Sequence, residues 1–307
     1  MSRLILGAMG FGPRDDEDPA ATLRRALAAT DAAVEAGITV VDHADIYGGG
    51  RAESVFGAVL AERPGLRQRL TLQTKCGITL PSDGRGGRYD LSPRAICERT
   101  LGSLDRLGVD HVDMLLLHRP DPLIDPRRVA EALVALHDSG RVLRVGVSNM
   151  SGAQIAHLQA SLPFPIVADQ LELSLAKRDF VESGVLVNHP DAAAVDFPHG
   201  TLEHCVAHGV ELQAWGALAQ GRYSGRPPQS EADAATSELV AALAADHDVS
   251  REAVVLAWLL RHPAGIRPVI GTTDPIRIRA CAEAESVELS GDDWYRLWVA
   301  ARGRPLP

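Results

Sequence analysis

The sequence has few cysteines and few aromatic residues for its length. Only four of its 307 residues are cysteine, and aromatic residues make up 4% of the chain. The cysteines, Cys76, Cys97, Cys205 and Cys281, lie far apart and form no CxxC pair. This spacing argues against a zinc site and against a disulfide framework. We therefore expect reduced thiols, no bound metal and a cytoplasmic location.

Long hydrophobic runs and an excess of positive charge are also absent. The apolar run in MSRLILGAMGFG covers only a few residues before glycines interrupt it, which is too short for the core of a signal peptide. No stretch of the sequence approaches the length of a membrane span. The formal net charge is −9 at pH 7, whereas nucleic acids and anionic membranes bind clustered Lys and Arg. The sequence therefore predicts neither of these as a partner.

Short apolar segments alternate with longer helical patterns along the whole chain. Between the apolar segments, apolar residues recur at three- and four-residue spacing, which predicts helices. Examples are residues 21–36, 93–107, 126–138, 151–162 and 250–261. The predicted strands are residues 4–6, 39–41, 70–74, 112–117, 144–148, 166–173, 210–214 and 267–270. Alternating strands and helices predict an α/β fold with a parallel sheet, and eight strands favour a closed (β/α)8 TIM barrel, one domain over residues 1–307.

An open, doubly wound sheet is the alternative architecture. Its nucleotide fingerprint is GxGxxG, and the glycines of GAMGFG at residues 7–12 are spaced differently. The polar segments at 77–90 and 219–235 follow predicted strands, where barrel enzymes carry their substrate loops. The barrel is therefore the favoured prediction.

Four polar residues stand at or just beyond the ends of three successive predicted strands. Asp42 follows the second strand and Tyr47 lies five residues further on, in VVDHADIYGGG. Lys75 follows the third strand and His118 the fourth. Taken singly, each residue also fits a structural role, such as a solvated strand end or a capping histidine. Because the carboxyl ends of barrel strands converge on one mouth, their coincidence favours an active site.

The chemistry of these four residue types is complementary. A phenol beside an ammonium group is a poised acid, since the cation stabilises the phenolate that forms when the proton leaves. A carboxylate at Asp42 would offset the cost of burying Lys75, and His118 can donate a hydrogen bond to a substrate oxygen. Such a site would protonate an oxygen while another group delivers hydride to carbon.

The segments DHADIYG, TKCG and LLLHRPD resemble the catalytic tetrad of the aldo/keto reductase superfamily. The resemblance continues through GRVLRVGVSN, ADQLELS, LQAWGALAQGR and VIGTTDPIRI, and it covers essentially the whole chain. It is greatest to a bacterial branch of predicted oxidoreductases. The resemblance implies reduction of an aldehyde or ketone, with Tyr47 as general acid, Lys75 and Asp42 as its tuning pair, and His118 orienting the carbonyl.

No role for His43 or Asp45 follows from the resemblance, and we expect both to be solvated or to lie behind the site. A barrel mouth with Asp42, His43, Asp45 and His118 could also hold a catalytic metal, which gives a metal-dependent hydrolase as one alternative. Other strand ends carry few further metal ligands, however. A second alternative is a nicotinamide-binding regulatory barrel with little activity, which the complete tetrad disfavours.

The resemblance also implies a nicotinamide cofactor, with NADPH preferred over NADH. Thr272 and Arg277 match residues that relatives place against the 2′-phosphate. Gly271 and Cys281 replace a Lys and an Asn of many relatives, so we expect a reduced preference. For Trp215, Arg222 and Arg277, a core or surface role remains open. The implied cofactor-binding residues are Ser148, Asn149, Gln170, Trp215, Gly216, Leu218, Gln220, Arg222, Gly271, Thr272 and Arg277.

The expected partner is a small-molecule carbonyl substrate, and the expected assembly is a monomer or a weak homo-oligomer. Substrate specificity in barrels lies in the loops. The candidate pocket residues are Ile46, Ile78, Arg119, the segment 175–197 and the tail from Arg302. Their mixture of apolar and polar side chains predicts a moderately polar carbonyl compound.

Overall fold

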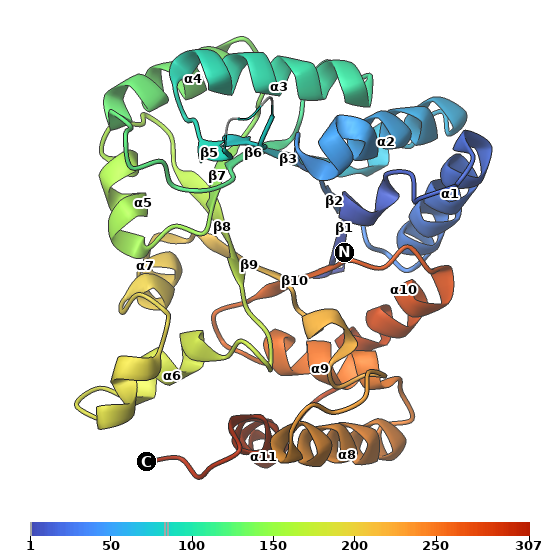
Figure 1. Ribbon diagram of the computed structural model, residues 1–307, viewed down its shortest axis with the longest axis vertical. Helices are drawn as coiled ribbons and strands as arrows, with labels where there is room; N and C mark the ends of the chain where they lie inside the picture. The colour runs from blue at the N-terminus through green and yellow to red at the C-terminus, as the bar shows by residue number, and fades with distance from the viewer. Residues whose placement is uncertain (1, 83, 85) are drawn as a thin grey trace.

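Eight parallel strands close into a barrel, with helices around it (Figure 1). The computed structural model describes residues 2–82, 84 and 86–307. The strands follow one another around the barrel in the order β1-β10-β9-β8-β7-β6-β3-β2. They are β1 (Ile5–Gly7), β2 (Val40–Asp42), β3 (Thr71–Cys76), β6 (Met114–Leu117), β7 (Val145–Ser148), β8 (Ile166–Glu172), β9 (Glu211–Trp215) and β10 (Arg267–Ile270). All eight predicted strands and the predicted barrel are thus confirmed.

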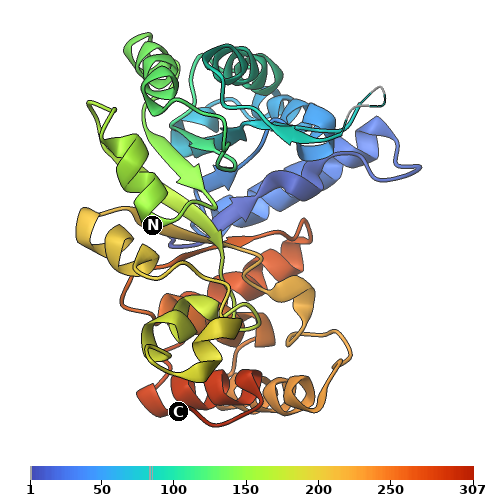
Figure 2. The same ribbon diagram turned by 60° about the vertical axis from the view of Figure 1, so that its left-hand side comes forward.

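Helices surround the barrel, and two of them form an additional layer. Helices α8 and α11 pack together beyond α9, along the lower edge of Figures 1 and 2. The helices are α1 (Pro19–Glu35), α2 (Arg51–Glu62), α3 (Pro93–Leu107), α4 (Pro126–Asp138), α5 (Gly152–Gln159), α6 (Asp179–Val185), α7 (Thr201–His208), α8 (Glu231–Asp246), α9 (Arg251–Leu260), α10 (Pro275–Ala282) and α11 (Gly291–Arg302). Within the described residues, no helix has the length and apolar character needed to cross a membrane.

The helix boundaries follow local capping signals. Helices α3 and α4 have the predicted bounds, and each starts with proline after a capping residue. The side chain of Ser92 accepts a hydrogen bond from the third backbone amide of α3, as expected of an N-cap serine. Ser151 and Ser250 lie just outside α5 and α9 as caps, so each of these helices starts one residue later than predicted.

Alternation along the strands decides which side chains enter the barrel. In β3, Leu72 and Cys76 belong to the apolar core, whereas Gln73 and Lys75 bond to side chains of other barrel strands. Lys75 is the penultimate residue of β3, and not the residue after it as predicted. The position still places its side chain at the carboxyl end of the barrel.

Two of the predicted loop segments contain regular structure. Within 77–90, β4 (Ile78–Thr79) and β5 (Arg88–Tyr89) form a short antiparallel pair. Within 175–197, α6 is followed by a short 3-10 helix, η4 (Pro190–Ala194). Both segments follow barrel strands and therefore lie at the end of the barrel where the tetrad is found.

Candidate active site

Three of the tetrad side chains form one hydrogen-bonded chain. The Lys75 ammonium donates to both oxygens of Asp42, at 2.8 and 2.7 Å, and lies 2.9 Å from Tyr47 Oη. It also donates to the backbone carbonyl of His43 at 2.9 Å. Lys75 and Asp42 are only 1% and 2% exposed. The ring of His118 meets the Tyr47 ring edge-on, with 6.2 Å between centroids, so all four predicted residues lie together.

Two glutamines hold the carboxylate of Asp42 from within the barrel. Gln73 Nε2 donates to Asp42 Oδ1 at 2.6 Å, and Gln170 Nε2 donates to the same oxygen at 3.0 Å. Both amides also donate to Gln213 Oε1. Gln170 therefore connects the tetrad with the predicted cofactor-binding residues. Sequence reasoning did not identify Gln73 or Gln213, although the two-residue spacing of Gln73 from Lys75 was an available signal.

The segment that carries Tyr47 has a fixed backbone. The three glycines at 48–50 have φ values of 58°, 67° and 90°, a left-handed region that glycine adopts without steric cost. They turn the chain from the strand end into α2. On the other side of Tyr47, Asp45 Oδ2 accepts a hydrogen bond from Arg99 Nη1 at 2.9 Å, and Arg99 also donates to Thr79 Oγ1. These contacts restrict where the phenol can lie.

The electrostatics of the site keep the phenol and the ammonium protonated. Burial raises the pKa of Tyr47 above its ordinary value, although Lys75 opposes the shift. Burial lowers the pKa of Lys75, but Asp42 and Tyr47 outweigh burial and the net shift is upward. Burial, with the charges of Lys75 and Arg119, lowers the pKa of His118 to about 3. The site at neutral pH thus holds a neutral phenol, a cation and a neutral imidazole.

Of the two alternatives expected for His43 and Asp45, the structure excludes the solvated one, and both side chains lie buried behind the site. His43 has no exposed surface, and its ring packs against Phe56 with 4.6 Å between centroids. Burial, then the charge of Lys75, lowers the pKa of His43 to about 3. Asp45 is buried too, and burial raises its pKa despite the ion pair with Arg99. Both side chains are enclosed because α2 and α3 cover this strand end.

Four predicted nicotinamide-binding residues form one connected group. Ser148 Oγ donates to the backbone carbonyl of Gln170 at 2.8 Å, and Asn149 Nδ2 donates to Ser148 Oγ at 2.7 Å. Trp215 Nε1 donates to Asn149 Oδ1 at 3.2 Å. The indole is partly exposed. Trp215 is therefore not a residue of the hydrophobic core, the role that the sequence had left open for it. Its N–H is anchored at one edge.

The loop after β9 has an unusual backbone. Gly216, Ala219 and Gln220 all have positive φ, at 67°, 46° and 57°. For the two residues that carry a β-carbon, this conformation costs roughly 1–3 kcal/mol each and is concentrated at ligand-binding segments. Leu218 packs against the core, while Gln220 Oε1 accepts a hydrogen bond from Arg226. The loop therefore has a defined shape.

The two arginines predicted near phosphates differ in their surroundings. Arg222 donates to Asp233 Oδ1 at 2.8 Å, and Asp233 is 2% exposed, so this guanidinium has a buried partner. Arg277 is 46% exposed and lies 3.3 Å from Glu252. A β-carbon at Gly221 would lie 4.0 Å from Arg277 Nη2, which places α10 beside the loop after β9.

Two further predicted positions precede α10. Thr272 Oγ1 accepts a hydrogen bond from the backbone of Asp274, and Gly271 is exposed. Cys281, which replaces an Asn of many relatives, is fully buried within the core. Its thiol therefore cannot contact a ligand at the surface.

The geometry argues against the metal-hydrolase alternative. Asp42 is bonded to Lys75 and two amides, and Asp45 is bonded to Arg99. Within the part of the chain that the structure describes, no group of three potential ligand side chains could hold a metal ion. The four cysteines are all free thiols.

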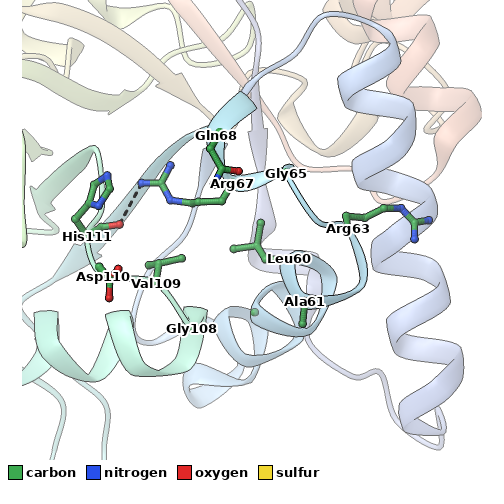
Figure 3. Close-up of a pocket in the computed structure, with 11 residues that line it drawn as sticks. Leu60, Ala61, Arg63, Gly65, Arg67, Gln68, Gly108, Val109, Asp110 and His111 are labelled. Carbon is green, nitrogen blue, oxygen red and sulfur yellow. Dashed lines mark hydrogen bonds between the residues drawn. The ribbon is translucent and has the colours of Figure 1, made fainter.

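A surface depression of about 480 Å³ lies at the opposite end of the barrel (Figure 3). The carboxyl ends of α2 and α3 border it, and Arg67 bridges it by donating to the backbone of His111 at 3.2 Å. This end of a barrel supports stability rather than catalysis. The tetrad lies at the other end of the barrel, where the strands have their carboxyl ends.

Comparison with known proteins identifies the fold and the relatives of this chain. Residues 3–299 match the family model described as Aldo/keto reductase family. A 6-dehydroglucose reductase of Agrobacterium fabrum is 37% identical, with 100% of this chain and 96% of the relative covered. The uncharacterized oxidoreductase YcsN of Bacillus subtilis is 39% identical, over 89% of this chain and 87% of the relative.

A solved structure shares the same architecture. The crystal structure of an aldo/keto reductase from Klebsiella pneumoniae in complex with NADP and acetate has a TM-score of 0.77 and 25% identity to this chain. The match covers 100% of this chain and 93% of the other.

Proposed function

This chain belongs to the aldo/keto reductase family, and on that basis we propose that it reduces a moderately polar aldehyde or ketone to an alcohol, preferring NADPH to NADH and using Tyr47 as proton donor. The observation that carries the proposal is the chain from Tyr47 through Lys75 to Asp42. A phenol whose proton is held by burial lies 2.9 Å from a buried ammonium. This arrangement suits an acid that must give up a proton and leave a stabilised anion.

The side chains have separate roles in the reaction. Tyr47 donates its proton to the carbonyl oxygen, and general acid catalysis of this kind contributes roughly 10²–10⁴-fold to rate. Lys75 stabilises the phenolate that remains, and Asp42 holds the ammonium in place. His118 is neutral at physiological pH and orients the carbonyl by donating a hydrogen bond to its oxygen.

The residues beside the tetrad fit a nicotinamide cofactor. When bound, a reduced nicotinamide supplies the hydride that reduces the carbonyl carbon. Ser148 and Asn149 offer a hydroxyl and an amide for its carboxamide, and Trp215 offers an aromatic face for stacking because its N–H is already bonded to Asn149. Arg277, at the outer end of this group, is suited to a 2′-phosphate.

The substrate class is a polar carbonyl compound, and a sugar aldehyde is the first candidate. The Agrobacterium relative is named for a sugar with an oxidised terminal carbon. In this chain the mouth carries polar side chains beyond the tetrad, including Arg119, whose charge acts on His118. Lys177 and Asp179 form an ion pair in the segment after β8. These groups favour a hydroxylated substrate over an apolar one.

A carbonyl panel tests the proposal. Purified protein is mixed with NADPH and, in separate reactions, 6-dehydroglucose, an aromatic aldehyde and an aliphatic ketone, while nicotinamide absorbance is followed. We expect the highest kcat/KM for the sugar aldehyde and a strongly reduced kcat in Tyr47→Phe. If absorbance falls no faster than in free cofactor for every compound, even in a single turnover, the reductase function is rejected. The alternative of a nicotinamide-binding regulatory barrel is then favoured.

A further inference from the structure

A column of polar side chains runs through the interior of the barrel beneath the tetrad. Gln73 in β3 and Gln213 in β9 lie side by side, and both are 0% exposed. Gln73 Nε2 donates to Gln213 Oε1 at 2.8 Å, and Gln213 Nε2 donates to Gln73 Oε1 at 3.0 Å. The interior layers of such barrels are usually filled by branched apolar residues. Two buried amides at this position therefore need an explanation.

The orientation of both amides is determined by carboxylates at the two ends of the column. Above, Gln73 Nε2 also donates to Asp42 Oδ1 at 2.6 Å. Below, Gln213 Nε2 also donates to Glu211 Oε1 at 2.8 Å, and Glu211 is paired with Arg267 at 3.0 Å. A carboxylate accepts but does not donate, so each amide must present its NH2 group to its carboxylate. The two remaining N–H groups then form the reciprocal pair.

We propose that Gln73 is a positioning residue for the proton-donating chain, and that Gln213 braces it. Gln73 holds the carboxylate of Asp42 from below so that the Lys75 ammonium stays directed at Tyr47. The proposal rests on the proposed reductase function, in which Lys75 must stabilise the phenolate. Gln73 is fully buried beneath the tetrad and acts through Asp42, whose carboxylate Gln170 also holds.

If Gln73 positions Asp42, substitutions at Gln73 and Gln213 should affect stability and catalysis differently. Gln73→Leu removes a hydrogen bond to the charged Asp42 and the reciprocal bonds to Gln213, which keeps only its bonds to Gln170 and Glu211. Such hydrogen bonds correspond to about tenfold or more in rate or equilibrium. Replacing both amides of this pair by apolar side chains of similar volume leaves neither one unpaired, while Gln170 keeps its bond to Asp42, and such double replacements are often nearly neutral for stability. A structural role and a positioning role are therefore separable.

The experiment compares Gln73→Leu, the double variant Gln73→Leu/Gln213→Leu and a control, Thr71→Val, in the same strand. We expect kcat to fall about tenfold in Gln73→Leu, with KM for the carbonyl within about twofold of wild type, and Tm to fall. In the double variant Tm should recover towards wild type while kcat stays low. The control should keep wild-type kcat.

Two outcomes overturn the proposal: kcat that recovers together with Tm in the double variant, or a Gln73→Leu protein that keeps more than half of wild-type kcat. A crystal structure of Gln73→Leu provides a readout that needs no turnover. We expect the Asp42 carboxylate to rotate or to occupy two conformers, with Lys75 displaced from Tyr47. An unchanged Lys75–Tyr47 hydrogen bond overturns the positioning role even if wild-type protein reduces no carbonyl, an outcome that would separately reject the proposed function.

Discussion

The ammonium of Lys75 lies 2.9 Å from the hydroxyl of Tyr47, and the carboxylate of Asp42 holds that ammonium from the other side. The order of these groups has a consequence for each of them. The ammonium can stabilise a negative charge on the phenol. The carboxylate offsets the free-energy cost of burying this cation away from water. Each member of the chain can be tested by a substitution that changes one function.

Removing the hydroxyl of Tyr47 tests the proton donor. Tyr47→Phe should lower kcat roughly 10²–10⁴-fold, because the aromatic ring stays but the acid is lost. The Kd for cofactor, measured by fluorescence titration, should stay close to wild type. Tyr295→Phe, at an exposed position on α11, is the control and should leave kcat unchanged. Retention of more than half of wild-type kcat in a chemistry-limited assay would reject the role of Tyr47.

Removing the charge of Lys75 tests the buried ion pair. Lys75→Met leaves the carboxylate of Asp42 buried without its cation, and breaking such a pair typically costs about 3–5 kcal/mol of stability. We expect a lower free energy of unfolding in urea together with lost activity, and the same combined loss in Asp42→Ala. Arg94→Met disrupts an exposed ion pair and should unfold at the wild-type midpoint. An unchanged midpoint in Lys75→Met would contradict the energetic role assigned to the pair.

Replacing Arg277 tests the cofactor preference. Charge-assisted contacts contribute about 1.5–3 kcal/mol each, so Arg277→Ala should raise the Kd for NADPH roughly tenfold to a hundredfold. The Kd for NADH should hardly change, because NADH has no 2′-phosphate. Arg279→Ala, in the same helix and likewise paired with a glutamate, Glu35 of α1, should alter neither value. Equal weakening of both cofactors by Arg277→Ala would show that this arginine does not contact the 2′-phosphate.

A buried acid outside the site predicts how stability depends on pH. Asp169 in β8 has no exposed surface, and burial raises its pKa to about 8 although the backbone N–H of Met150 opposes the shift. The unfolded chain loses this proton near pH 4, whereas the folded chain keeps it until about pH 8. Folding therefore takes up a proton between these values, and stability from this group falls as pH rises across that window.

Asp169→Asn should remove this pH dependence. We expect Tm close to wild type near pH 4.5 and above wild type near pH 8, measured by circular dichroism. The neighbouring Cys205 does not complicate the comparison, because burial raises the pKa of its thiol to about 12. Asp110→Asn, at an exposed position, should track wild type at every pH. Parallel curves for wild type and Asp169→Asn would contradict the prediction.

The strands, the barrel and the meeting of Asp42, Tyr47, Lys75 and His118 at its mouth could be predicted from the sequence. These features depend on spacing within one segment: alternating residues in a strand, three- and four-residue recurrence in a helix, and a serine or aspartate before a proline at a helix start. Asp42, Lys75 and His118 were recognisable because each follows or ends its own apolar run. Such patterns are local, and the barrel then brings the strand ends together by its closure.

Only the tertiary structure decided what surrounds each of these residues. Gln73 and Gln213 are 140 positions apart, and nothing in either segment indicates that their amides pair beneath Asp42. For His43 and Asp45 the sequence left both solvent exposure and a place behind the site open, and packing decides for the second, because Phe56 of α2 covers His43 and Arg99 of α3 pairs with Asp45. Burial, partner and pKa depend on packing across the barrel between distant segments, whereas the sequence alone determined which groups arrive at its mouth.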